Sequence, residues 1–433
     1  MTSPSTASTV KQSIWQNRNF VILLSTGFLL SFGSRVYELA LPLIIYELTQ
    51  SSVAMGTMRA LQFLPIFLFG MVIGVFVDRA DKKRWMLTVI GLQTLALFSL
   101  YFWASTPAPG ERNVMVFYVA GFFLMLLNYG YVNARITSVK WALPTAMMTS
   151  ANAKFTFIQT LMQVMGPAIS GAILFLSSLY LGLLITAVMY FLGLLALTRL
   201  QLQESARREE RSSFAEELRA GWLALRQNHV LWVMTLFVVF FNASSIVYEL
   251  MVIFFVKDEL HWSTAQVGIV MSCAGIGGLL GSVLTERIRR AIGIGGALAL
   301  SLIILGLTYS LTGFHRSAWS VGAAMFAFGF MTTMQNICIW AYRHETTPAP
   351  LIGRVSGMTG AIFKIGVPLA LLGAGVLADM AGARMVFMVC GVVQALVFLV
   401  FMRSRLMAAS EICGVVTGAD MLLFSRRWSV RKK

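Results

Sequence analysis

Hydrophobic residues along this chain gather in long runs that are separated by short polar links. Most runs hold about 20 residues or more, the length that a helix needs to cross a hydrocarbon core of ~30 Å. The runs lie near residues 20–46, 53–77, 85–104, 114–138, 155–177, 179–198, 230–256, 265–285, 292–312, 318–341, 357–378 and 385–402. This pattern predicts an all-α integral membrane protein with twelve transmembrane helices.

The longest polar link, residues 199–229, holds six Arg and five Glu and separates the first six runs from the last six. Within it, Ser213-x-x-Glu216 has the form of a capping box, which predicts a short helix along the inner membrane surface. We therefore expect a cytoplasmic N-terminal segment (1–19), an N-terminal six-helix bundle (20–198), a central cytoplasmic loop (199–229), a C-terminal six-helix bundle (230–405) and a basic cytoplasmic tail (406–433).

Composition and charge exclude several soluble classes. Of the 433 residues, 58% are hydrophobic and 12% are charged, whereas soluble proteins carry about 25% charged residues. The net charge of +16 would suit a nucleic-acid partner, but the basic residues gather on one side of the predicted membrane. If the N-terminus is cytoplasmic, the cytoplasmic segments hold 26 Lys and Arg and the external links hold four. This bias predicts two cytoplasmic termini in a bacterial inner (plasma) membrane, contacts with anionic lipid and no nucleic-acid partner.

The sequence also predicts that the chain is not an enzyme and binds no cofactor or metal. The four cysteines (Cys273, Cys338, Cys390 and Cys413) lack metal-ligand spacing. The phosphate-binding pattern G-x-x-x-x-G-K-[ST] does not occur, so we do not expect ATP hydrolysis. We expect a monomer.

The two halves share short sequence matches in the same order, which indicates an internal duplication. Val36-Tyr37-Glu38-Leu39 recurs as Val247-Tyr248-Glu249-Leu250 at an offset of 211. Asp78-Arg79-x-x-Lys82-Lys83 is matched by Glu286-Arg287-x-Arg289-Arg290 at an offset of 208. Gly166-Pro167 with Gly171 is matched by Gly366-x-Pro368 with Gly373.

A family resemblance rests on the link after the second run. Gly74-Val-Phe-Val-Asp78-Arg79-Ala-Asp-Lys82-Lys83-Arg84 resembles the signature loop G-x-x-x-D-R-x-x-[KR]-[KR] of the major facilitator superfamily. Phe32, Gly33 and Pro42 in the first run are most similar to bacterial exporters, namely macrolide-type drug efflux proteins and the enterobactin exporter. The resemblance implies secondary active transport by alternating access between two pseudo-symmetric six-helix halves.

The fifth run bears on the direction and coupling of transport. Gly166-Pro167-Ala-Ile-Ser-Gly171 is similar to the span-5 signature of antiporters in this superfamily, but the longer run of upstream glycines is missing. With Pro368, these residues are expected to bend helices. The leading hypothesis is an exporter of an amphipathic small molecule, drug or siderophore-like, by proton antiport. The alternatives are a proton-coupled importer of an organic anion and a non-transporting membrane receptor or scaffold.

The signature loop predicts an inner gate. A carboxylate at Asp78 would lie near a helix N-terminus, where the helix dipole favours negative charge. Gly74 would allow close helix approach, and the basic residues would pair across the cytoplasmic gap. The alternative is a loop that only anchors to anionic lipid. The gate residues are Gly74, Asp78, Arg79, Lys82 and Lys83, with Glu286 and Arg287 in the second copy.

Two glutamates inside the runs are candidates for proton coupling, because an ionisable side chain in a membrane span is costly. Arg35 and Glu38 stand three residues apart on one helix face, where they can pair. Glu249 has no basic residue within one turn of its own helix, which favours its neutral form and makes it the better proton carrier. The alternative for Arg35 and Glu38 is mutual neutralisation without a transport role.

The remaining candidates would line a substrate cavity. Arg135 resembles the span-4 arginine of superfamily antiporters, and its alternative is snorkelling to the membrane surface. Lys364 would pair with Glu249 or bind an anionic group of the substrate, unless it also snorkels. The predicted substrate and cavity residues are Arg35, Arg135, Lys364, Tyr37, Tyr248, Asn133, Gln163 and Asn336.

Overall fold

The computed structural model describes most of the chain between residues 13 and 403. Outside the description lie residues 1–12, 107–112, 145–146, 149, 152–153, 156, 160, 163–164, 167–177, 203–221, 224, 348–354, 356–357, 361 and 404–433. The expected capping box in the central link and the expected basic tail therefore fall outside it. The long elements of the described part are α-helices: α1 (Arg18–Thr49), α2 (Ser52–Arg79), α3 (Lys82–Ser105), α4 (Val114–Ala142), α6 (Leu179–Thr198), α8 (His229–Asp258), α9 (Thr264–Thr312), α10 (Ala318–Thr346) and α12 (Val367–Arg403).

Polar residues in the short links fix where these helices begin. The side chain of Asp81 accepts a hydrogen bond from the backbone N–H of Arg84 at the start of α3, and Asn228 does the same for Leu231 at the start of α8. Ser263 and Gln266 form a complete capping box at the start of α9. Such caps satisfy the N–H groups that a helix leaves unpaired in its first turn.

Nine of the described helices are long and apolar enough to cross a membrane. Two of them are divided by a glycine in a backbone conformation that side-chain-bearing residues rarely adopt: Gly293 in α9 (φ 72°) and Gly382 in α12 (φ 79°). The expected spans 265–285 and 292–312 both lie within α9, on either side of its glycine. Helix α12 likewise contains the second part of the expected span 357–378 and all of 385–402. The expected span 155–177 lies largely outside the described residues. The protein is a multi-pass membrane protein whose described long elements are all helices, and the count of twelve spans stays a prediction.

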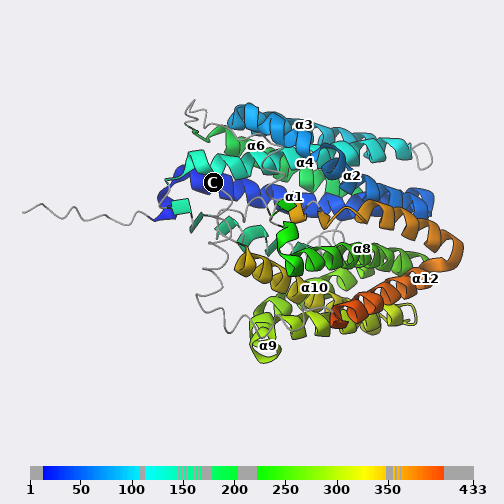
Figure 1. Cartoon of the computed structure of the whole chain (residues 1–433). Helices are drawn as coiled ribbons and strands as arrows, with labels where there is room; N and C mark the ends of the chain where they lie inside the picture. Colours follow the sequence, from blue (N-terminus) through cyan, green and yellow to red (C-terminus); the bar gives the residue numbers. More distant parts are fainter. Residues whose placement is uncertain are drawn as a thin grey trace, which may run out of the picture. The chain divides into compact units, whose positions relative to one another are not determined.

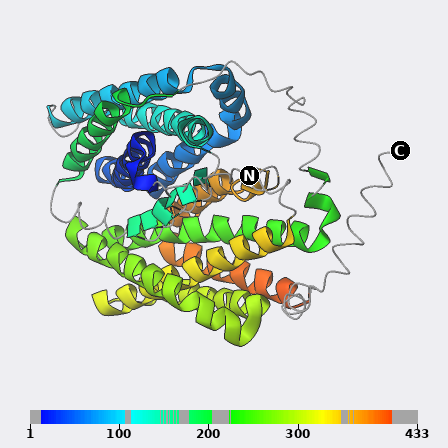
Figure 2. The same ribbon diagram turned by 90° about the vertical axis from the view of Figure 1, so that its left-hand side faces the viewer.

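The chain divides into two compact units, each described separately here. The first contains Met1–Ile44, Leu64–Gly166 and Ser177–Glu209, and the second contains Ile45–Phe63, Pro167–Leu176 and Glu210–Lys433. In the first unit α3 packs along both α4 and α6; in the second α9 packs along α10, and α12 packs along α8 and α9 (Figures 1 and 2). Helices α9 and α10 approach closely at Gly281, which has no side chain: a Cβ there would lie only 2.7 Å from the carbonyl oxygen of Phe330.

The division into units departs from the boundaries read from the sequence. Residues 45–63, at the end of α1 and the start of α2, belong to the second unit. They are held there by polar contacts: the Tyr46 hydroxyl donates to Asp258 Oδ1 at 2.8 Å, and Ser52 Oγ donates to the carbonyl oxygen of Gly375 at 2.8 Å. Lys257 Nζ lies 3.4 Å from Glu47 Oε1. Helix α1 therefore contributes residues to both units.

Candidate functional site

Arg35 and Glu38 form an ion pair on α1, as their spacing predicts. Arg35 Nη1 lies 3.2 Å from Glu38 Oε2, and the side chains are 41% and 14% exposed. The aliphatic stem of Arg35 crosses Gly166, where an added Cβ would lie 3.0 Å from both Cγ and Cδ of the arginine. Gly166 thus leaves room for the arginine. Pro167, Gly171 and Gln163 lie outside the described residues, so their expected roles stay predictions.

Three fully buried tyrosines lie near this pair in the first unit: Tyr37 on α1, Tyr131 on α4 and Tyr190 on α6. Tyr190 interacts electrostatically with Glu38 and with the other two tyrosines. The hydroxyls of Tyr131 and Tyr190 have no hydrogen-bond partner among the described residues. The sequence named Tyr37 and Tyr131 as residues of a cavity wall but did not indicate Tyr190, because the three tyrosines come from helices far apart in the chain.

The second copy of the tetrapeptide lies on α8 in different surroundings. Glu249 is half-buried, and it takes part in at least one contact with another group. Tyr248 is fully buried and stacks on Tyr309, with the ring centroids 4.2 Å apart. Its hydroxyl oxygen forms a hydrogen bond with Thr312 Oγ1 at 2.8 Å. Tyr248 is therefore part of the packed interior of the second unit in this structure.

Arg135 lies inside the first unit with only 5% of its surface exposed. Its guanidinium contacts Gly27 on α1 and lies over the ring of Phe155, 5.4 Å from the ring centroid. Its Nε has no hydrogen-bond partner within the described part of the chain. This position is enclosed by protein, which is not the extended arrangement of a snorkelling side chain.

Lys364 is exposed and lies in a turn, residues 363–366, immediately before α12. The amide nitrogen of Asn242 on α8 donates to the carbonyl oxygen of Phe363 in this turn at 3.2 Å. Pro368 follows as the second residue of α12, where its missing N–H is tolerated because first-turn N–H groups have no helical partner. Pro368 thus lies in the first turn of α12. The expectation that Pro368 bends a helix stays a prediction.

The other polar cavity candidates are half-buried. Asn133 donates to the backbone oxygen of Tyr129 on its own helix at 2.9 Å, and Asn336 lies on α10. These observations do not identify a ligand, so substrate binding by Asn133 and Asn336 stays a prediction.

The expected gate residues lie at the end of α2 and the start of α3. The side chains of Gly74, Asp78 and Arg79 fall outside the description, although their backbone is the last two turns of α2. Lys82 is buried, its Nζ donating to the carbonyl oxygen of Ala80 at 2.7 Å, and Lys83 is half-buried. The carboxylate that caps α3 is that of Asp81, which sequence reasoning did not single out.

The second copy of the gate motif forms an ion-pair network between α9 and α10. Glu286 lies 2.9 Å from Arg290 and 3.5 Å from Arg289. Arg289 also reaches Glu345 on α10 at 3.2 Å, while Arg287 is exposed. The motif copy therefore ties two helices of the second unit together.

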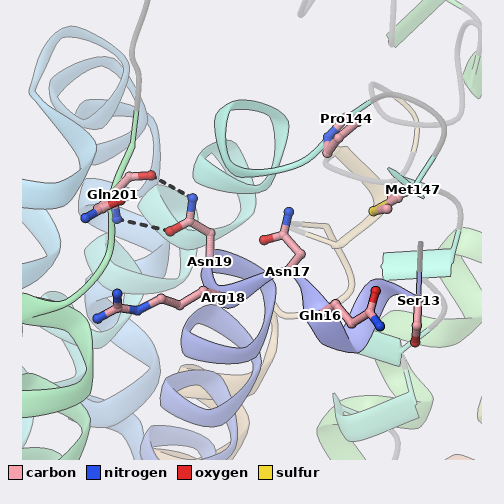
Figure 3. Close-up of a pocket in the computed structure, with 8 residues that line it drawn as sticks. All are labelled: Ser13, Gln16, Asn17, Arg18, Asn19, Pro144, Met147 and Gln201. Carbon is pink, nitrogen blue, oxygen red and sulfur yellow. Dashed lines mark hydrogen bonds between the residues drawn. The ribbon is translucent and has the colours of Figure 1, made fainter.

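A polar pocket of about 350 Å³ lies at the start of α1 (Figure 3). Asn19 forms two hydrogen bonds with the backbone of Gln201, at 2.7 and 3.1 Å, which join the start of α1 to the residues after α6. The pocket is lined by Ser13, Gln16, Asn17, Arg18, Asn19, Pro144, Met147 and Gln201.

Comparisons with known proteins agree with this architecture. The chain is 21% identical over 371 residues to macrolide efflux protein A of Streptococcus pyogenes, covering 83% of this chain and 89% of the relative. It is 23% identical over 347 residues to the enterobactin exporter EntS of Escherichia coli O1:K1 / APEC, covering 78% of each. A crystal structure of a bacterial homologue of iron transporter ferroportin in inward-facing state matches with a TM-score of 0.69 at 14% identity, covering 90% of this chain and 99% of that one.

The family itself is shown by a match that spans most of the chain. The model of the Major Facilitator Superfamily matches residues 23–371, which include the signature loop and both copies of the repeated tetrapeptide. The chain is a bacterial transporter rather than an enzyme, and it belongs to the major facilitator superfamily.

Proposed function

We propose that this protein is a secondary active exporter that moves an amphipathic small molecule out of the bacterial cell in exchange for protons. The observation that carries the proposal is the pair of repeated glutamates, Glu38 and Glu249, which lie in the apolar helices α1 and α8. Carboxylates inside membrane spans are costly and mark ion or substrate pathways. The similarity to macrolide efflux protein A and to the enterobactin exporter EntS supports an export direction.

The two glutamates take different parts in this proposal. Glu38 lies 3.2 Å from Arg35 on the same helix, so the pair moves with α1 as one body. Glu249 has no basic residue within one turn on α8. Any contact that neutralises Glu249 comes from outside that turn and can change when helices move. Glu249 is therefore the residue that loads and releases a proton.

Alternating access also needs two gates. The inner gate is assigned to Gly74, Asp78, Arg79, Lys82 and Lys83, with Glu286 and Arg287 in the second copy. Lys and Arg asymmetry supports two cytoplasmic termini, which would place the end of α1 at the outer face. The contacts of Tyr46 with Asp258 and of Glu47 with Lys257 then form the outer gate, and both must open for release. Gly166, Pro167, Gly171 and Pro368 supply the bends.

The substrate has an acidic or strongly polar group on an apolar body. Basic residues support this class: Arg35 on α1, Arg135 on α4 and Lys364 before α12. The polar candidates Asn133, Gln163 and Asn336, together with Tyr37 and Tyr248, would complete the cavity. A siderophore-like chelator and an amphipathic drug both have this character. The domain organisation read from the sequence, a monomeric state and contacts with anionic lipid belong to the same proposal.

The experiment is a transport assay in inverted inner-membrane vesicles that contain the protein or an empty vector. A respiratory substrate acidifies the vesicle interior, and a pH-sensitive dye reports proton release when a macrolide or a catecholate siderophore is added. Proton antiport predicts release with at least one compound in the protein-containing vesicles alone. Uptake of that compound with further acidification would identify a symporter and contradict the proposal. The exposed Asp379 on α12 provides a matched control, since Asp379→Asn is expected to leave proton release unchanged.

A further inference from the structure

Arg343 on α10 is a buried cation whose charge no described residue balances. Only 2% of its surface is exposed, and it lies one turn before the helix ends at Thr346. Its guanidinium carbon lies 3.9 Å from the ring centroid of Trp340, and Nη1 donates to Thr359 Oγ1 at 3.0 Å. Nε and Nη2 have no hydrogen-bond partner among the described residues.

The carboxylate nearest to Arg343 along α10 is already engaged elsewhere. Glu345 pairs with Arg289 of α9 at 3.2 Å. Residues two apart on a helix point to different sides, so Glu345 and Arg343 belong to different faces of α10. A buried charge without a counter-charge is expensive, and such groups cluster at functional sites.

The internal repeat gives a second, independent instance of this arrangement. Arg135 of α4 precedes Arg343 by 208 residues, the offset that also relates the two gate motifs. Arg135 is buried, lies over an aromatic ring, and has an Nε without a hydrogen-bond partner in the described part of the first unit. Each unit therefore holds one enclosed arginine against an aromatic ring.

The unpartnered edge of Arg343 has the geometry of an oxyanion clamp. The N–H groups of Nε and Nη2 point the same way along one side of the planar guanidinium, and this fork matches the two oxygens of a carboxylate or phosphate. Nη1, on the other side, is fixed by Thr359. Trp340 stacks on one face of the guanidinium and is 50% exposed, so its indole lies beside the plane in which a ligand would bind and can report on it.

We propose that Arg343 is the centre of an oxyanion-binding site in the second unit, with Trp340 stacked on the face of its guanidinium. The ligand is a carboxylate or phosphate group held by Nε and Nη2. The site does not depend on the direction or the coupling of transport, because it rests on contacts within one unit. A bound oxyanion would replace the missing counter-charge and favour the conformations that admit it.

Trp340 makes the site directly observable. The full-length protein is placed in nanodiscs of phosphatidylcholine, and tryptophan fluorescence is titrated with sodium benzoate or with benzamide, its neutral counterpart. The signal of Trp340 is the difference between the wild type and Trp340→Phe. We expect a saturable change with benzoate and an affinity for benzamide that is lower by about tenfold or more. Arg343→Gln should abolish the change, and Arg343→Lys should weaken it because an ammonium lacks the fork.

Control variants and a lipid arm complete the test. Arg316→Gln removes an exposed arginine before α10 and should leave the benzoate response unchanged. Benzoate should also raise the melting temperature of the wild type and not that of Arg343→Gln. In phosphatidylglycerol nanodiscs without benzoate, an Arg343-dependent change of Trp340 would identify the oxyanion as a lipid phosphate, which also supports the site. No Trp340 response to either probe, or an equal response in Arg343→Gln, would overturn the proposal.

Discussion

The tetrapeptide Val-Tyr-Glu-Leu occurs in α1 and again in α8, and its polar groups are satisfied differently in the two units. In α1, Glu38 pairs with Arg35. Tyr190 interacts electrostatically with Glu38 and Tyr131, and the hydroxyls of both tyrosines have no hydrogen-bond partner in the described structure. The first unit thus keeps one local ion pair beside unsatisfied neutral groups.

In α8 the neighbouring hydroxyls are paired. Tyr248 is joined to Thr312, and Tyr309 lies 2.9 Å from Ser245 through its hydroxyl. Gln394 donates to Ser244 Oγ at 2.9 Å, which links α12 to the same stretch of α8. These buried hydrogen bonds join α8 to α9 and α12. The second unit therefore pairs the hydroxyls beside Glu249, whereas the first unit gives Glu38 an ion-pair partner on its own helix.

The difference teaches that a duplicated sequence need not keep a duplicated role. A charge pair within one helix is insensitive to the movement of that helix against others. A carboxylate without a basic residue in its own helical turn can be neutralised only by groups on other elements or by a proton. The comparison therefore supports the proposal that Glu38 has a structural role and Glu249 a coupling role, and each of the following changes tests one side of it.

The largest stability effect is expected for Glu38→Gln, which leaves Arg35 without its counter-charge. Loss of a partner for a charged group costs about 1–3 kcal/mol, so the amount of folded protein in the membrane should fall clearly. Immunoblots and thermal unfolding of the purified protein measure this. The double variant Arg35→Met/Glu38→Gln should recover much of the loss, and a double variant as unstable as Glu38→Gln would show that the pair does not explain it.

A smaller effect is expected from tyrosine hydroxyls, and it should differ between the units. Tyr309→Phe removes the partner of Ser245 and should cost about 1 kcal/mol. Tyr190→Phe removes a buried hydroxyl that has no hydrogen-bond partner in the described structure, so its stability should be unchanged or higher. Melting temperatures of the two purified variants make the comparison. A larger loss in Tyr190→Phe than in Tyr309→Phe would show that its hydroxyl binds a water molecule or another group.

The smallest effect concerns two glycines that the repeat relates. An added Cβ at Gly166 would lie 3.0 Å from the stem of Arg35, whereas one at Gly366 would lie 3.4 Å from Val239 Cγ1, an ordinary contact. Gly166→Ala should therefore be less stable than Gly366→Ala, by less than about 1 kcal/mol, because Arg35 is flexible and can shift. Equal melting temperatures would show that the arginine adapts without disturbing its pair with Glu38.

Much of the fold could be predicted from the sequence because membrane spans and helix caps are local signals. The i, i+3 spacing of Arg35 and Glu38 also gave the ion pair correctly, since it depends on one helix alone. The grouping of Tyr131 and Tyr190 with Glu38 could not be found in this way, because it arises only when three helices pack together. The assignment of residues 45–63 to the second unit likewise depends on long-range contacts such as Ser52 with Gly375.

Arg343 was not recognised from the sequence as a buried residue, because its position suggested a cytoplasmic link. It lies just beyond the apolar run 318–341, so it counts among the 26 cytoplasmic cations that predict orientation. The structure extends α10 to Thr346 and encloses the side chain. The internal repeat contained the missing clue, because an offset of 208 from Arg135 leads to Arg343. Motif copies are thus worth searching for single buried residues as well as for loops.

The most direct test of the central claim is substrate-induced proton release by Glu249→Gln and Glu38→Gln in inverted vesicles, corrected for protein abundance. The account predicts that Glu249→Gln is as abundant as the wild type and releases no protons, although it still binds the substrate. It predicts that Glu38→Gln is scarce, with proton release per molecule close to that of the wild type. Proton release by Glu249→Gln, together with an abundant but uncoupled Glu38→Gln protein, would contradict the account and reverse the two roles.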